Sequence, residues 1–230
     1  MKKDSKHILC YLYVCFVVIL LTWVGDLPVS RLYQGVELGG HEIFYMLYFM
    51  MFFTRVCLIM GNSEQYMQRY AIYTVVRSKS REMIWKNCII SAVKIVSLFY
   101  VWTLICSIVC TSIWSNGSIV WNPNVYREIV LFYSVDTLLM MIQLLLEVLI
   151  NSRAAILLIG SFYMSSFFLA DNYFQSEFFG KLCWFLFPNL GMVKRLPQNV
   201  FVYEVILITI VSNVILYLLG KNLINKKDIL

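Results

Sequence analysis

The sequence predicts an all-α, polytopic membrane protein with six transmembrane helices, and three observations lead to this fold class. First, 60% of the 230 residues are hydrophobic and only 14% are charged, whereas soluble domains carry about 25% charged residues. Second, six apolar runs are long enough to span, because a helix needs about 20 apolar residues to cross a bilayer. Third, no connection is long enough to form an extramembrane domain with its own core. We therefore expect one transmembrane domain over residues 1–230.

The apolar runs place the six spans at about residues 8–25, 41–60, 84–114, 129–150, 154–170 and 200–219. The first run follows Met1-Lys2-Lys3, as the apolar part of a secretory signal does. A small residue is required before a cleavage point, but Trp23 stands there. The sequence therefore predicts an uncleaved first span.

The orientation follows from the basic residues. With a cytoplasmic N-terminus, twelve of them fall on the inside and five on the outside. Cytoplasmic loops of membrane proteins typically carry such an excess of lysine and arginine. Both termini are therefore predicted to be cytoplasmic, and nucleic acid is not expected as a partner. The inside set is Lys2, Lys3, Lys6, Arg69, Arg77, Lys79, Arg81, Lys86, Arg153, Lys221, Lys226 and Lys227, and the outside set is Arg31, Arg127, Lys181, Lys194 and Arg195. Arg55 and Lys94 are left within spans.

The sequence gives little support for enzyme chemistry. His41-Glu42 begins like the H-E-x-x-H zinc motif, but Tyr45 occupies the position of the second histidine. The seven cysteines lie mostly in apolar runs without a C-x-x-C pair, so we interpret them as small buried hydrophobes. A phosphate-binding loop is also missing. We expect no catalytic residue, no metal and no cofactor bound by this chain, and any ATP hydrolysis would belong to a partner chain.

The fourth span carries a polar stripe. In V-D-T-L-L-M-M-I-Q-L-L-L-E-V-L-I, the side chains of Asp136, Gln143 and Glu147 fall within about 40° of one another on a helix. Ionisable groups inside a bilayer usually face a cavity or a partner helix. The stripe could line a substrate path, or it could bond to a neighbouring span, with Lys94 and Asn213 as candidate partners.

Two connections between spans are unusual. Residues 171–199 are assigned outside but are rich in aromatic residues, and the apolar part ends at Pro188. A re-entrant or interfacial pair of short helices is predicted there, with Trp184 at the headgroups. Between spans two and three, Tyr66, Tyr70 and Tyr73 recur at helical spacing and predict a short amphipathic helix.

That helix is followed by R-S-K-S-R-E-M-I-W-K, in which Ser80 is suited to cap the third span. The run resembles the R-P-x-S-R-x-x-x-x-G-K pattern between spans two and three in type-2 permease subunits of ATP-binding-cassette exporters, including peptide or lantibiotic export and immunity systems. The run has one residue fewer between Arg81 and Lys86 than the pattern has between its second arginine and its lysine, and Ser78 and Trp85 stand in place of the common proline and glycine. The matching positions are Arg77, Ser80, Arg81 and Lys86.

The resemblance implies a multi-pass permease in a bacterial cell membrane, with a coupling helix that rests on a cytoplasmic ATPase. MgATP would be bound by that ATPase, and a second permease subunit, identical or not, would complete the substrate path. The cargo would be a peptide or another amphipathic molecule. The residues expected at the ATPase are Tyr66, Tyr70, Tyr73, Arg77, Lys79, Ser80, Arg81 and Lys86.

Two other classes are left open by the sequence. The first is a membrane scaffold or immunity protein that transports nothing and binds a partner in the bilayer. The second is an intramembrane enzyme, which the lone His41 disfavours. A tightly associated ATPase would distinguish a permease from both.

Overall fold

The computed structural model describes residues 2–25, 32–67, 81–114, 124–173, 184–197 and 200–226. All regular elements in these ranges are helical. The α-helices are α1 (Lys2–Gly25), α3 (Glu42–Ile59), α4 (Asn62–Gln65), α6 (Arg81–Trp114), α7 (Val125–Leu149), α8 (Ser152–Tyr173) and α9 (Val202–Lys226). Two 3-10 helices, η3 (Phe187–Gly191) and η4 (Val193–Arg195), lie between α8 and α9.

Among the described residues, five helical segments are long and apolar enough to cross a membrane, and a shorter apolar helix covers His7–Trp23. The all-helical class is therefore confirmed, and each predicted span lies on a helix of the structure. The five segments are Glu42–Gln65, Glu82–Trp114, Val125–Leu149, Ser152–Asn172 and Val202–Asn225. These helices are compatible with a membrane-embedded protein, while the count of six spans and the cytoplasmic termini stay predictions.

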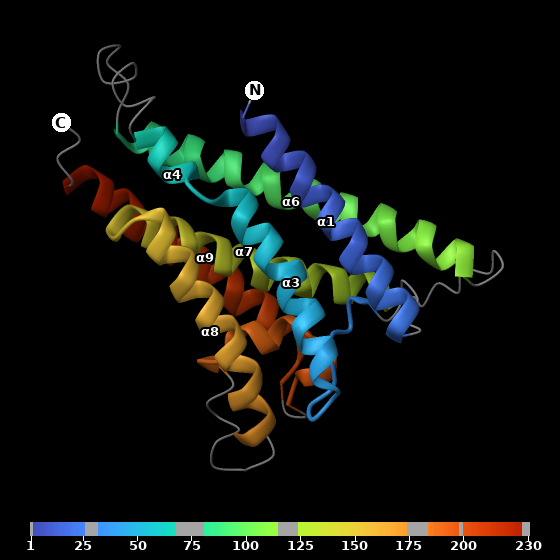
Figure 1. The fold of residues 1–230 in the computed structure, drawn as a ribbon. Coiled ribbons are helices and arrows are strands. Elements are labelled where there is room, and N and C mark those ends of the chain that lie inside the picture. Colours follow the sequence, from blue (N-terminus) through green and yellow to red (C-terminus); the bar gives the residue numbers. More distant parts are fainter. Residues whose placement is uncertain are drawn as a thin grey trace.

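The long helices form one bundle (Figure 1). Helices α1 and α6 run alongside each other, and α3 crosses in front of α7. The described ends of the chain lie on the same side of the bundle as α4 and the start of α6 (Figure 1). The predicted coupling segment therefore connects to the bundle on the side where both ends of the chain lie.

Trp85, which replaces a glycine of the resembled motif, is a buried residue of α6. Its indole Nε1 donates a hydrogen bond to the Tyr217 carbonyl of α9 at 3.1 Å. A Cβ at Gly220 would lie 2.2 Å from the Trp85 ring, so only glycine leaves room for this contact. Next to it, Lys221 and Glu82 form a 2.8 Å ion pair. These contacts join the start of α6 to α9, which continues past Gly220 beyond the predicted end of the span.

The aromatic connection before α9 is packed into the bundle where the structure describes it. Helix η3 lies against α7 and α8. Its residues Pro188 to Gly191 are buried, and Trp184 packs against the core. Two short 3-10 helices lie in the described part, residues 174–183 lie outside the described residues, and the re-entrant or interfacial pair stays a prediction.

Candidate functional site

The polar stripe of α7 is buried inside the bundle rather than exposed on its surface. The side chains of Asp136, Gln143 and Glu147 are all buried. They face α3 and the break between α3 and α4, where the opposing polar groups come from Arg55, Gly61 and Ser63. The structure therefore brings all three predicted residues into one continuous network.

Asp136 is paired with Arg55 of α3. The Asp136 Oδ1 lies 2.8 Å from the Arg55 Nη2, and Arg55 is fully buried. The guanidinium also lies 4.6 Å from the centre of the Phe52 ring. A charge inside a bundle is costly unless a charge of opposite sign accompanies it, so Arg55 and Asp136 account for each other's presence.

Gln143 connects the ion pair to the end of α3. Its Oε1 accepts a hydrogen bond from the Arg55 Nη1 at 3.4 Å. Its Nε2 donates to the Val56 carbonyl at 3.0 Å and to the Glu147 Oε1 at 3.3 Å. The amide thus uses both its acceptor and its donors, as a buried amide requires.

Glu147 holds the start of α4. Helix α3 ends before Gly61, whose φ of +76° is favourable for glycine. The Glu147 carboxylate then accepts hydrogen bonds from the Gly61 N–H at 3.1 Å, the Ser63 N–H at 3.3 Å and the Ser63 hydroxyl at 2.8 Å. An acidic group is stabilised by the unpaired N–H groups at a helix start. The stripe therefore ends on the backbone that leads into the predicted coupling segment.

A second carboxylate fixes α4 to the next helix. The Glu64 Oε1 accepts a hydrogen bond from the Ser152 N–H at 3.0 Å, at the start of α8. Asn151 caps the same helix, because its Oδ1 accepts from the Ala154 N–H at 2.7 Å. Helix α4 is thereby bonded to α7 through Glu147 and to α8 through Glu64.

The partners predicted for the stripe were wrong. Lys94 is exposed on α6, and Asn213 of α9 donates to the Thr137 hydroxyl at 3.4 Å instead of to a stripe residue. The real charged partner, Arg55, is also a basic residue within a predicted span. The sequence shows both Arg55 and Lys94 as basic residues within predicted spans. The choice between them depends on the packing of α3, and not the exposed face of α6, against the stripe.

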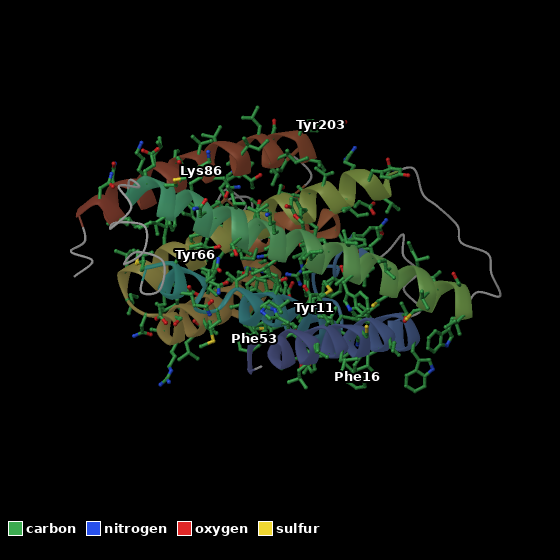
Figure 2. The ribbon with its side chains drawn as sticks, turned by 90° about the horizontal axis from the view of Figure 1, so that it is seen from above. Tyr11, Phe16, Phe53, Tyr66, Lys86 and Tyr203 are labelled. Atoms are coloured by element: carbon green, nitrogen blue, oxygen red, sulfur yellow. The ribbon has the colours of Figure 1, made fainter. Side chains whose placement is uncertain are left out.

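The predicted ATPase-coupling residues are only partly within the described structure. Tyr66 follows α4 and is half-buried, and Lys86 is exposed on α6. Both lie at the same end of the molecule (Figure 2). Arg81 begins α6, with its side chain outside the described atoms. The other predicted positions lie outside the described residues, namely Tyr70, Tyr73, Arg77, Lys79 and Ser80.

Sequence reasoning missed a second buried arginine, Arg195 of η4. Its Nε donates to the Val36 carbonyl at 3.0 Å, its Nη1 to the Asn189 Oδ1 at 2.7 Å and its Nη2 to the Asp171 Oδ1 at 3.1 Å. The guanidinium also lies 4.6 Å from the centres of two aromatic rings, those of Tyr45 and Phe167. The sequence predicts Arg195 only as an outside charge, because a loop position gives no sign of burial.

The described part of the chain contains no cluster of metal-binding side chains. Within those residues, no group of three or more His, Cys, Asp or Glu side chains could hold a metal ion. Tyr45, which replaces the second histidine of the zinc motif, donates from its hydroxyl to the Glu37 carbonyl at 3.1 Å. Its ring belongs to the surroundings of Arg195.

Comparison with known protein families places the whole network in one family. The family described as "protein of unknown function (DUF2705)" matches residues 15–230. The chain belongs to the DUF2705 family. No curated protein and no solved structure matched the chain.

The matched region of this DUF2705 protein holds both buried arginines and the complete α7 stripe. It also includes the R-S-K-S-R run, so the candidate site and the candidate coupling segment lie within one family region.

Proposed function

We propose that this DUF2705 protein is the membrane-spanning subunit of an ATP-driven exporter and that it works with a separate cytoplasmic ATPase. The observation that supports this proposal best is the bonding of Glu147 to Gly61 and Ser63. Through these bonds, the start of the connection that carries the R-S-K-S-R motif is attached directly to the polar stripe in the bundle.

This attachment offers a physical connection through which an ATPase could move the bundle, as the resemblance to exporter permeases implies. Movement of the coupling segment would pull on α4, and α4 is held by Glu147 of α7 and by Ser152 of α8. Closure of the ATPase on MgATP would therefore act on two long helices at once. A ligand shifts a protein between two conformations only if it binds one of them more tightly. MgATP would therefore move the helices only if the MgATP-bound ATPase binds one arrangement of the helix bundle more tightly than the other.

The remaining parts of the proposal concern the assembly and the cargo. A dimer of permease subunits would enclose the path, and an amphipathic molecule such as a peptide would be exported. The aromatic segment before α9 would enter the membrane from the outer side as a re-entrant element. Both termini would lie in the bacterial cytoplasm, where the ATPase is available.

A pulldown in mild detergent tests the coupling. The tagged full chain is purified from its native host, and the copurifying ATPase is measured by ATP hydrolysis and mass spectrometry. Reversing the charges at Arg77, Lys79 and Arg81 to glutamate should lower the bound ATPase by about tenfold or more, because one contact surface loses its charge complementarity.

The matched control reverses three basic residues on the predicted outer side, Arg31, Arg127 and Lys181, and should retain the ATPase. Equal loss in both variants would mean that total charge, not the coupling segment, determines binding. If the unaltered chain brings down no ATPase, the exporter proposal fails and a membrane scaffold or immunity protein is favoured.

A further inference from the structure

Two thiols from distant parts of the chain meet where α1 packs against α6. The Sγ atoms of Cys15 and Cys106 lie 3.0 Å apart, although 91 positions separate the two residues in the sequence. Both residues are half-buried and carry free thiols. A disulfide bond is about 2.05 Å long, so an approach of about 1 Å between the two sulfur atoms would suffice to form one.

The register of the two helices holds these thiols opposite each other. One turn before the thiols, the Trp102 indole donates to the Tyr11 carbonyl at 3.1 Å, and the two rings pack edge to face at 6.0 Å. Tyr11 and Trp102 each precede their cysteine by four residues, which places them one turn away on the same helix face. Tyr11 lies between α1 and α6, whereas Phe16 points outward (Figure 2).

The thiols lie close to an exposed apolar surface of the bundle rather than in its centre. On α1, Ile19 follows Cys15 by one turn and is 39% exposed. On α6, Ile105 and Val109 beside Cys106 are 47% and 51% exposed. Apolar exposed side chains on membrane helices face hydrocarbon, so a reagent dissolved in the bilayer can approach the pair, whereas a charged reagent in water cannot.

We propose that Cys15 and Cys106 are a dithiol pair that a lipid-soluble quinone oxidises to a disulfide within the membrane. The two thiols lose two protons and two electrons as the S–S bond forms, and the quinone takes up both and becomes the quinol. The product links α1 to α6 covalently and removes their freedom to separate. This inference depends on the packing of α1 against α6 and on the location of these helices in a membrane, and it does not require the proposed transport function.

The test uses the full chain with all its cysteines, reconstituted in phosphatidylglycerol and phosphatidylethanolamine liposomes. Duroquinone is the oxidant, because its four methyl groups hinder direct addition of thiols to the ring. Remaining thiols are blocked with N-ethylmaleimide, and unreduced digests are analysed by mass spectrometry. The expected product is a peptide pair that contains Cys15 and Cys106 and disappears with dithiothreitol.

Matched serine variants separate this pair from general oxidation. Cys15→Ser and Cys106→Ser should each lower total cross-linking at least tenfold, and Cys88→Ser, a buried position elsewhere on α6, should leave it unchanged. No cross-link in the unaltered chain would overturn the proposal even if a variant fails to fold. Cross-links of similar yield between Cys15 and Cys110 would also overturn it, because the pair would then have no preferred geometry.

Discussion

Two arginines are buried among the described residues, and their surroundings differ in how completely each is paired. Arg195 donates through all three of its nitrogen atoms, to one backbone carbonyl and two side chains. Arg55 has its ion pair with Asp136 and a long hydrogen bond to Gln143, while its Nε has no hydrogen-bond partner among the described residues. Arg195 is held from several directions, and Arg55 mainly from one.

This difference has a consequence for how each arginine can be replaced. The role of Arg55 is mostly to neutralise Asp136, and such a pair can often be exchanged for apolar residues of similar volume. Arg195 also satisfies a backbone carbonyl and the Asn189 amide oxygen, which would stay buried without a donor. We therefore expect the two sites to respond differently when both members of the ion pair are removed.

The largest effect is expected at Arg55. Arg55→Met leaves the buried Asp136 carboxylate without its charged partner and should lower the free energy of unfolding by about 3–5 kcal/mol. The double variant Arg55→Met with Asp136→Leu should return to within about 1 kcal/mol of the unaltered protein. Unfolding in mixed detergent micelles measures both values. A double variant as unstable as the single one would show that the charges are needed for more than neutralising each other.

A somewhat smaller effect is expected at Arg195, because the Asp171 side chain is 19% exposed and can reach water when its partner is lost. Arg195→Met should cost about 3 kcal/mol, from several lost hydrogen bonds to a charged donor. Adding Asp171→Leu should recover little, since the Val36 carbonyl remains unpaired. The neighbouring variant Lys194→Met is the control and should cost less than about 1 kcal/mol, because its pair with Glu37 is exposed.

Recovery in the second double variant would abolish the distinction between the two arginines. It would mean that the hydrogen bonds of Arg195 to Val36 and Asn189 contribute little to stability and that only its charge requires a partner.

The smallest effect is expected at the end of the stripe. Glu147→Gln replaces one carboxylate oxygen with an amide NH2 group, which would face the hydrogen-bond donors of Gly61 or Ser63. This variant should lower the free energy of unfolding by about 1–2 kcal/mol. Ser63→Ala removes one donor only and should cost about 1 kcal/mol. If Glu147 transmits movement from α4, Glu147→Gln should reduce export in whole cells at equal membrane abundance, whereas a fall in abundance alone would make its role structural.

Much of the fold could be predicted because transmembrane helices are defined by local composition. The predicted span 41–60 and the observed Glu42–Ile59 nearly coincide, since the hydrophobic run itself sets the limits. Helix α9 continues to Lys226, past the predicted end of the last span at about 219. A glycine and a lysine normally indicate a helix end, but packing of Trp85 on Gly220 and the Lys221–Glu82 pair stabilise further turns.

The candidate site was predictable only in part. Helical spacing alone puts Asp136, Gln143 and Glu147 on one face, and burial of that face follows from its place in an apolar span. The stripe's hydrogen bonds to Gly61 and Ser63 could not be foreseen, because they depend on the break after α3.

The sequence by itself determined the apolar helices, the excess of basic residues on one set of connections and the polar face of α7. These features depend on residues close together in the chain, whose spacing fixes the face that they share. The tertiary structure decided which charges pair, which loop arginine is buried and which two cysteines meet. Such partners lie tens of residues apart, and only the way in which helices cross brings Arg55 to Asp136 and Cys15 to Cys106.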